Sequence, residues 1–203
     1  MHDGDMNSSA YTAPVRLEGE LVTLEPLTVE HHDELVDAVK DGELWKLWFT
    51  RVPAPERMSE EIATRLRRLD EGTMIPLVLR SAPTGQMLGM TTYYDPDVAN
   101  RNIEIGYTWM RASVQGTGVN AEAKLLMLRH AFEVIGCERV ELRAHHMNQP
   151  SRRAIERLGA HLDGVLRRHT LLPNGTWRDT CVYSILKYEW PAVETGLLAR
   201  LES

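Results

Sequence analysis

Hydrophobic side chains recur along the chain with the two periods that distinguish helices from strands. Apolar positions three or four residues apart predict helices over residues 28–41 and 59–71. The same spacing is sustained longest over residues 118–135 and ends at Gly136, a residue type common just beyond a helix. A further short helix is expected over residues 151–158, before Gly159.

Short apolar or alternating segments between these helices predict strands. Turn residues at 83–85 and 173–175 join four of them into two antiparallel hairpins. The strands are expected near residues 21–24, 77–79, 87–94, 102–110, 139–146, 162–171 and 176–186. Because strands and helices alternate in the second half of the chain, the pattern favours one mixed α/β domain built on a single sheet.

The strand over residues 102–110 has the clearest alternation in the chain. Successive side chains of a strand point to opposite faces, so its odd-numbered and even-numbered positions should separate. One face is expected to carry Ile103, Ile105, Tyr107 and Trp109, and the other Glu104, Gly106 and Thr108.

The two ends of the chain differ in character from the middle. Residues 1–14 mix small and polar residues and are expected to be a flexible leader, residues 15–190 to form the domain, and residues 191–203 to be a tail. No stretch approaches the roughly 20 consecutive apolar residues that cross a bilayer, and the start lacks the order of a signal peptide. We therefore expect a cytoplasmic protein with no membrane partner.

Composition narrows the classes of partner. Of 203 residues, 43% are hydrophobic and 26% charged, and the formal net charge of -6 argues against a general nucleic-acid binder. Five arginines still gather in the last third and could meet an anionic ligand or form a solvated surface: Arg152, Arg153, Arg157, Arg167 and Arg168. Cys137 and Cys181 stand alone in their segments, which is typical of small core residues rather than of a disulfide framework or a metal site.

The segment before the longest helix suggests phosphate binding. It joins the end of a strand to a helix start, where unpaired N–H groups and the helix dipole favour an anion, and glycines allow close approach. Its residues are Gln115, Gly116, Thr117, Gly118, Val119 and Asn120. Neither a nucleotide P-loop nor a dinucleotide fingerprint fits, and a plain tight turn remains the alternative.

A second polar group follows the next strand. Asn148 and Ser151 place an amide and a hydroxyl beside another helix start, ahead of Arg152. They would suit the polar arm and the sulfur of a coenzyme A. Alternatively, Ser151 is simply the N-cap of that helix.

Together these segments resemble the GCN5-related N-acetyltransferases, and within them the Rim-type branch that acetylates protein N-termini. The resemblance runs from Leu17 to about Trp190, and its specific parts are residues 104–107, 115–123 (QGTGVNAEA) and 148–159 (NQPSRRAIERLG). It implies a mostly antiparallel twisted sheet that splays between two parallel strands, here 102–110 and 138–146, and holds acetyl-CoA in that wedge. Asn120 departs from the glycine or alanine usual at its position.

The resemblance also implies roles for individual residues. Binding of acetyl-CoA is assigned to Trp109, Met110, Arg111, Gln115, Gly116, Thr117, Gly118, Val119, Asn120, Asn148, Ser151 and Arg152. Ser151 is the candidate donor to the leaving sulfur, and Glu104 the candidate base, acting through water. Some relatives carry the base as a glutamate in the strand after Gly164, but residues 166–170 of this chain include no carboxylate, so His169 is the alternative base. A zinc site built from His145, His146 and His169 is a further alternative. We expect no metal.

The amine acceptor is left open by the sequence. A protein N-terminus and a small-molecule amine are both compatible with the resemblance. A non-catalytic coenzyme A-binding protein is the alternative to an enzyme, and the protein could form a homodimer. The acceptor site should be shaped by residues 45–72 and by the loop around Asp95, because such connecting segments hold specificity. A groove rich in acidic residues would favour cationic small molecules, and an open cleft would favour a peptide.

Overall fold

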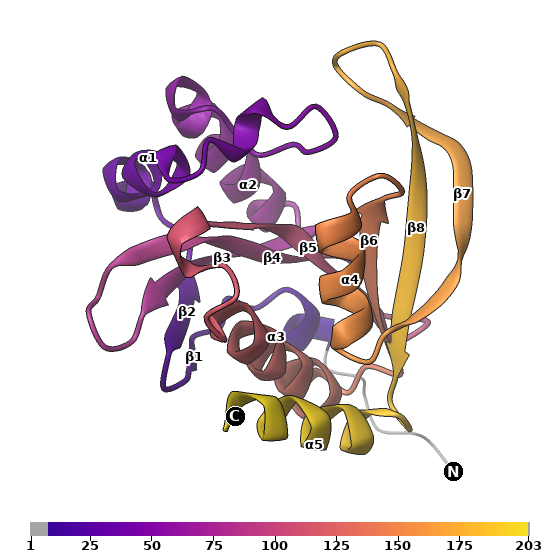
Figure 1. Cartoon of the computed structure of the whole chain (residues 1–203). Helices are drawn as coiled ribbons and strands as arrows, with labels where there is room; N and C mark the ends of the chain where they lie inside the picture. The colour runs from indigo at the N-terminus through magenta and orange to yellow at the C-terminus, as the bar shows by residue number, and fades with distance from the viewer. Residues whose placement is uncertain (1–7, 203) are drawn as a thin grey trace.

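The computed structural model, which describes residues 8–202, has one eight-stranded sheet flanked by helices (Figure 1). The strands are β1 (Leu17–Glu18), β2 (Val22–Pro26), β3 (Met74–Ser81), β4 (Met87–Asp97), β5 (Asn102–Met110), β6 (Arg139–His145), β7 (His161–Leu171) and β8 (Trp177–Leu186). The helices are α1 (His32–Lys40), α2 (Met58–Asp70), α3 (Val119–Arg129), α4 (Gln149–Arg157) and α5 (Trp190–Leu201). This confirms the predicted mixed α/β fold with a mostly antiparallel sheet. Among the described residues, no helix has the length and apolar character needed to cross a membrane.

The sheet separates two hydrophobic cores. Helices α1 and α2 pack on β3 and β4 and enclose the smaller core, which includes Trp109. On the other face, α3, α4 and α5 enclose the larger core, which includes Ile103 and Ile105 (Figure 1). A ligand held at the centre of the sheet could therefore be approached from either face.

The sheet opens between β5 and β6. The strand order is β1-β2-β3-β4-β5-β6-β8-β7, and β5 and β6 are its parallel neighbours. They pair over three residues each, from Asn102 to Glu104 and from Arg139 to Glu141, and then diverge. Beyond Glu104, the β6-facing edge of β5 therefore has no strand partner, which leaves backbone N–H and C=O groups for a ligand. The splay between two parallel strands expected from the sequence is confirmed.

A β-bulge interrupts β5 within this open stretch. Between the pairs Met90–Trp109 and Thr92–Gly106, β5 advances three residues while β4 advances two, and Tyr107 has a φ of 49°. One extra residue reverses the alternation of faces. Trp109 consequently packs in the core below α1 and α2, opposite Ile103 and Ile105, so the predicted common face for these side chains is wrong.

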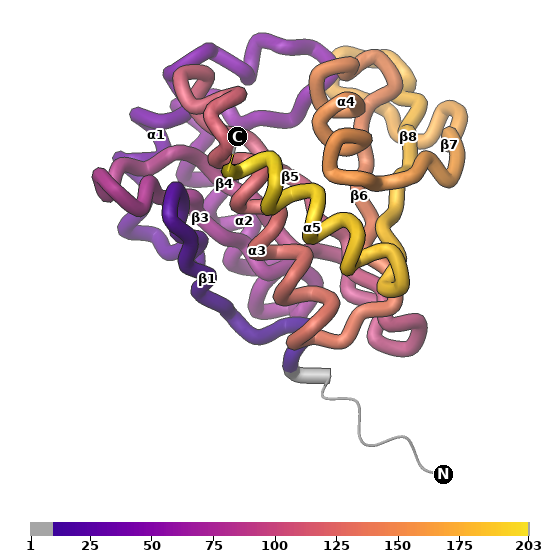
Figure 2. Tube along the Cα trace, turned by 60° about the horizontal axis from the view of Figure 1, so that its bottom comes forward, coloured from indigo at the N-terminus to yellow at the C-terminus, as the bar shows by residue number. Residues whose placement is uncertain are grey.

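Both described ends of the chain are part of the fold. Residues 8–11 form a short 3-10 turn, and the Tyr11 side chain is buried in the larger core; residues 1–7 of the expected leader lie outside the described range. The expected tail forms α5, which runs along α3 (Figure 2) and buries Leu197, while Trp190 stacks on Phe132 with ring centroids 5.5 Å apart. The apolar surface of these side chains explains why the segment packs rather than extends into solvent.

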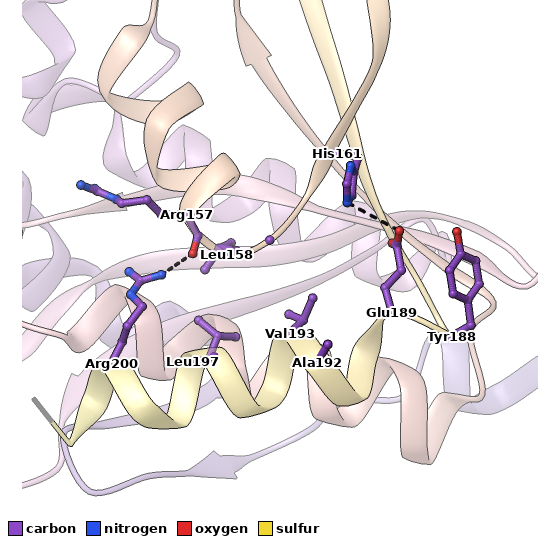
Figure 3. Close-up of a pocket in the computed structure, with 11 residues that line it drawn as sticks. Arg157, Leu158, His161, Tyr188, Glu189, Ala192, Val193, Leu197 and Arg200 are labelled. Carbon is purple, nitrogen blue, oxygen red and sulfur yellow. Dashed lines mark hydrogen bonds and ion pairs between the residues drawn. The ribbon is translucent and has the colours of Figure 1, made fainter.

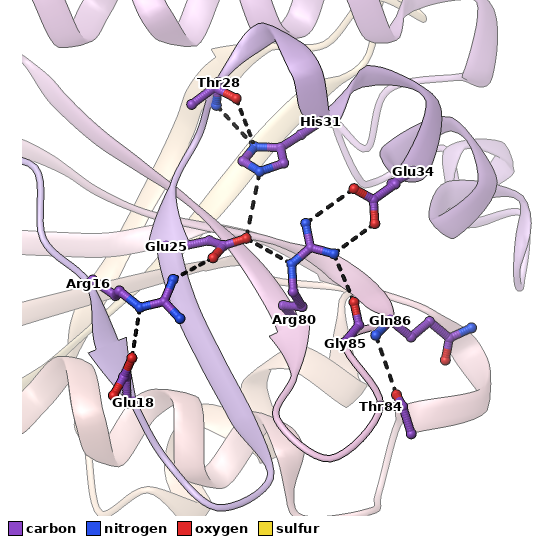
Figure 4. A network of polar contacts seen from close by, with 10 residues as sticks. All are labelled: Arg16, Glu18, Glu25, Thr28, His31, Glu34, Arg80, Thr84, Gly85 and Gln86. Carbon is purple, nitrogen blue, oxygen red and sulfur yellow. Dashed lines mark hydrogen bonds and ion pairs between the residues drawn. The ribbon is translucent and has the colours of Figure 1, made fainter.

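A network of ionic contacts joins β2 and β3 to α1. The Arg80 guanidinium contacts Glu25 at 2.8 Å and Glu34 at 2.7 Å, and Arg16 extends the network to Glu25 at 2.6 Å (Figure 4). These arginines hold the pKa values of the Glu25 and Glu34 carboxyls below their usual range, against the opposing effect of burial on Glu25. Such partly exposed pairs each contribute about 0–1 kcal/mol, so the network helps to orient α1 without dominating stability.

Candidate active site

The loop between β5 and α3 presents a group of unpaired backbone donors. Gly116 and Gly118 have φ values of 82° and 90°, in the left-handed region that favours glycine, and Gly118 is the N-cap residue of α3. Within the described part of the chain, five N–H groups in this loop and the first turn of α3 have no hydrogen-bond partner: those of Gly116, Gly118, Val119, Asn120 and Ala121. Together with the helix dipole they form an environment suited to an anion.

The start of α3 is held in place by a buried carboxylate. Glu122, only 7% exposed, accepts hydrogen bonds from the backbone N–H groups of Glu20, Leu21 and Val22 at 2.8–2.9 Å. A Cβ atom on Gly118 would lie 3.2 Å from a Leu21 methyl carbon. Gly118 is therefore required by the backbone and the neighbouring turn, and a larger residue there would strain the fold before it reached a ligand.

Trp109, Met110 and Arg111 have their side chains inside the protein. Trp109 and Met110 belong to the two cores, and the Arg111 guanidinium lies on the α1 side, donating to the Met87 carbonyl at 2.8 Å and to Asp37 at 2.5 Å. Arg111 in turn holds the pKa of the Asp37 carboxyl below its usual range. If these residues flank the arm of coenzyme A as expected, the Arg111 guanidinium does so while bound to its partners on the α1 side.

The start of α4 lies beside the wedge, at the end of β6. Asn148 is the N-cap residue, and its side-chain oxygen accepts from the Ser151 N–H at 3.1 Å. The N-cap alternative for Ser151 is therefore wrong, because Ser151 lies inside the helix. Its hydroxyl has no hydrogen-bond partner among the described residues, which leaves it able to donate to a ligand.

The five arginines between Arg152 and Arg168 differ in their surroundings. Arg152 donates to the Tyr183 hydroxyl at 3.0 Å and to the His146 carbonyl at 3.1 Å, so its guanidinium links α4 to β8 and β6. Arg167 pairs with Asp179 at 2.5 Å, and Arg168 lies over the Trp177 ring. Arg153 and Arg157 are exposed on α4. Of these side chains, Arg153 and Arg157 are left most free to meet an anionic ligand.

Glu104 lies at the base of the wedge on the α1–α2 side of the sheet. It is 4% exposed, its Oε1 atom has no partner among the described residues, and its Oε2 atom lies 3.3 Å from the Arg143 Nε atom. Burial raises the pKa of Glu104 to about 8, although Arg143 opposes the shift. A carboxyl group with such a pKa is ionised in part near pH 8, where its carboxylate form can accept a proton.

A chain of charges continues from Glu104 along this face. Arg143 also contacts Glu141, which pairs with Arg139 at 2.7 Å, and Arg139 pairs with Asp163 at 2.9 Å. Burial is the largest influence on the Arg143 guanidinium, yet Glu104 and Glu141 keep its pKa raised. These side chains neutralise one another.

The candidate histidines are not arranged as a metal site. His145 is 2% exposed; its Nδ1 atom accepts from the Met147 N–H at 3.1 Å, which places its proton on Nε2, and burial lowers its pKa. Its ring lies edge-on to Trp48 at 5.3 Å and stacks on His146 at 4.8 Å. His169 contacts the Thr180 hydroxyl at 3.1 Å. Within residues 8–202, no group of three His, Cys, Asp or Glu side chains could hold a metal ion.

A surface groove between α4 and α5 lies away from these residues. It is lined by side chains that include Leu158, Tyr188 and Val193 (Figure 3). It adjoins the C-terminal end of α4, whereas Asn148 and Ser151 lie at the other end of that helix. The wedge between β5 and β6 is therefore the better candidate site.

Comparison with known proteins agrees with this arrangement. Residues 22–161 match the family model described as an acetyltransferase (GNAT) domain. YdaF of Bacillus subtilis (strain 168), named as a candidate ribosomal N-acetyltransferase, is 36% identical over 106 residues, which are 52% of this chain and 57% of YdaF. The chain thus spans somewhat more than half the length of that relative.

Solved structures extend the match to almost the whole chain. The crystal structure of a candidate acetyltransferase from T. thermophilus is 36% identical, with a TM-score of 0.81, and the match covers 93% of this chain and 98% of that one. Mycobacterium smegmatis RimJ in complex with CoA-disulfide shares the fold at 23% identity, with a TM-score of 0.76 and 93% of both chains covered. Because the matching family model covers residues 22–161, more than half of the chain, this chain belongs to the GNAT acetyltransferase family.

Proposed function

We propose that the protein transfers the acetyl group of acetyl-CoA to a primary amine, and that this amine is the N-terminus of a protein, as in the Rim-type branch. The observation that carries the proposal is the open wedge between β5 and β6, with the unpaired N–H groups of residues 116–121 at one end and Glu104 at its base. YdaF and RimJ, which bear names from that branch, support the choice of a protein acceptor.

We infer that coenzyme A enters from the α3–α4 side. Its pyrophosphate would accept hydrogen bonds from the N–H groups of residues 116–121, and its amide-containing arm would pair with the unpartnered edge of β5 beyond Glu104. The RimJ structure holds CoA-disulfide, which supports a coenzyme A site on this fold. The amine would then approach from the opposite face, where Glu104 lies.

The reaction follows from these positions. The neutral amine attacks the thioester carbonyl carbon, a C–N bond forms, and the C–S bond breaks as the tetrahedral intermediate collapses. The proton lost by the amine passes to Glu104, directly or through water, and the Ser151 hydroxyl donates a hydrogen bond to the departing sulfur. The raised pKa of Glu104 suits this role, because a base is most effective when its pKa lies near the working pH.

Mass spectrometry of reaction mixtures tests the proposal. The protein is incubated with acetyl-CoA and peptides that have a free N-terminus, with the same peptides blocked at the N-terminus as controls, and with small amines such as spermidine. We expect acetylation of the free α-amine alone. Acetylation of small amines but no peptide would favour the small-molecule alternative, and coenzyme A binding without any transfer would indicate a non-catalytic binder.

A further inference from the structure

Arg178 has no ionic partner among the described residues and lies on the face of the sheet that carries Glu104, here called the acceptor face because the amine is proposed to approach from it. Its Nε atom is buried and has no hydrogen-bond partner among residues 8–202, and no described carboxylate lies within ion-pair distance of the guanidinium. By contrast, Arg139 and Arg143 on the same face each contact a carboxylate at 3.3 Å or less. A half-buried cation with an unused donor is unfavourable unless something pairs with it.

The position of Arg178 follows from the strand register. On β8, Thr180 lies opposite His145, and Val182 opposite Arg143. Because alternate residues of a strand share a face, Arg178 lies on the same face as these side chains and as Glu104. Burial is the main cause that lowers the pKa of Arg178, and Glu104 and Arg143 are close enough for their charges to influence it as well. Arg178 is therefore a neighbour of the proposed base.

Arg51 brings a second positive charge to the same place. It follows the aromatic residues Trp48 and Phe49, whose rings contact His145 at the end of β6. Arg51 is exposed, has no ion pair with a described residue, and is the charge that most lowers the pKa of Arg178 after burial. Two adjacent guanidinium groups repel each other, and a bound anion would relieve that repulsion.

The other charges on this face do not balance the pair. Glu104, Glu141 and Asp163 contact Arg139 and Arg143, so even an ionised Glu104 leaves one negative charge in this group against the two positive charges of Arg51 and Arg178. Asp95 influences Arg143 and is paired with Arg68 at 3.1 Å. The uncompensated charge beside the wedge is therefore positive, which disfavours polyamines and other polycationic acceptors.

We propose that Arg51 and Arg178 bind a carboxylate carried by the acceptor, so that the substrate is a primary amine with an acidic group close to it. This inference rests on the proposed function and names its acceptor class. The chemistry is shared by a peptide with an acidic residue next to its N-terminus and by a free amino acid. If Arg178 only tuned Glu104, its loss would alter the pH profile and leave the preference for acidic acceptors unchanged.

The test compares acceptors that differ in one charge. Three amidated peptides of one sequence, with Asp, Asn or Lys as second residue, are used beside free alanine and alaninamide, which differ only in the α-carboxylate. In the parent protein we expect kcat/KM for the Asp peptide to exceed that for the Asn peptide by about tenfold or more, because a charge-assisted pair contributes about 1.5–3 kcal/mol. A preference seen only for alanine over alaninamide would identify the small-molecule source.

Variants then assign the preference to the arginines. Arg178→Gln and Arg51→Gln should bring the Asp-to-Asn ratio toward one, whereas Arg67→Gln, which removes an exposed arginine of α2, should leave the ratio unchanged. A ratio near one in the parent, or a ratio that survives in both variants, would overturn the inference. Calorimetric affinities of the same acceptors for the coenzyme A-saturated protein give the same comparison without turnover, so failure of the chemistry would be distinguished from failure of acidic recognition.

Discussion

A charge placed in the loop before α3 should separate coenzyme A binding from folding. Asn120 is the second residue of α3, among the N–H groups that have no partner. Asn120→Asp keeps the shape of the side chain and adds a negative charge at the positive end of the helix dipole. In the free protein this charge should stabilise the fold by about 0.3–1 kcal/mol.

The same charge should oppose the pyrophosphate. Two unit charges about 6 Å apart repel by about 0.7 kcal/mol at the dielectric constant of water and by about 3 kcal/mol at an effective value of 20. The affinity for coenzyme A should therefore fall by about threefold to a hundredfold. The loss should shrink as salt is added, because the loop is at the surface and its charges are screened.

Titration calorimetry at low and high salt, with thermal denaturation of the free protein, measures both effects. Ser59→Asp is the matched control, since Ser59 is the exposed second residue of α2 on the other face of the sheet. Both variants should melt at or above the parental temperature, and only Asn120→Asp should lose affinity. If Asn120→Asp bound coenzyme A as tightly as the parent at low salt, the loop would not be the pyrophosphate site.

Five further substitutions address the roles of single side chains. Ser151→Ala should lower kcat and leave the coenzyme A affinity and the stability nearly unchanged. Asn148→Ala should lose about 1 kcal/mol of stability in denaturant titrations, because Asn148 is the N-cap residue of α4. Equal stability losses in the two variants would contradict these separate roles. Glu104→Gln should remove the limb of the pH–rate profile near pH 8, and His169→Ala should keep it; the reverse result would make His169 the base. The raised pKa of Glu104 also contributes stability that is fully present below about pH 4.5 and lost as pH rises through about 8, so the Gln variant should lack that slope. Lys124 is buried against the Thr91 and Thr108 hydroxyls, and burial lowers its pKa to about 7. Its contribution to the free energy of unfolding is present above about pH 10.5 and is lost as pH falls through about 7. A Lys124→Met variant that kept this pH dependence of stability would refute the assignment.

Local patterns were sufficient to predict most of the elements. The glycine at 136 ends the helical stretch that begins with α3, the turn residues at 173–175 join β7 to β8, and β5 has the predicted bounds. The bulge in β5 could not be predicted. The sequence alternates in the same way with or without a bulge, but the extra residue changes which face of the sheet the following side chains point to. Helix α5 was not predicted because its stability depends on long-range packing. Trp190 and Leu197 are buried by contacts with residues distant in the sequence.

The candidate site divides in the same way. The loop before α3 is visible in the sequence because its glycines and the helix start are adjacent. Residues 45–72, which contain Trp48, were expected to shape the acceptor site, but the grouping of Trp48 with Glu104, His145 and Arg178 was not predicted. These side chains come from four separate segments that only the folded sheet brings together. Arg111 and Arg152 were assigned to the cofactor by position, but their guanidinium groups have partners inside the protein.

A crystal structure of the protein with coenzyme A would test the central claim most directly. The account predicts the pyrophosphate within hydrogen-bond distance of the N–H groups of residues 116–121, and the sulfur between β5 and β6 near the Ser151 hydroxyl, with Glu104 on the opposite side of the wedge. Coenzyme A bound instead in the groove between α4 and α5, with the wedge empty, would contradict it.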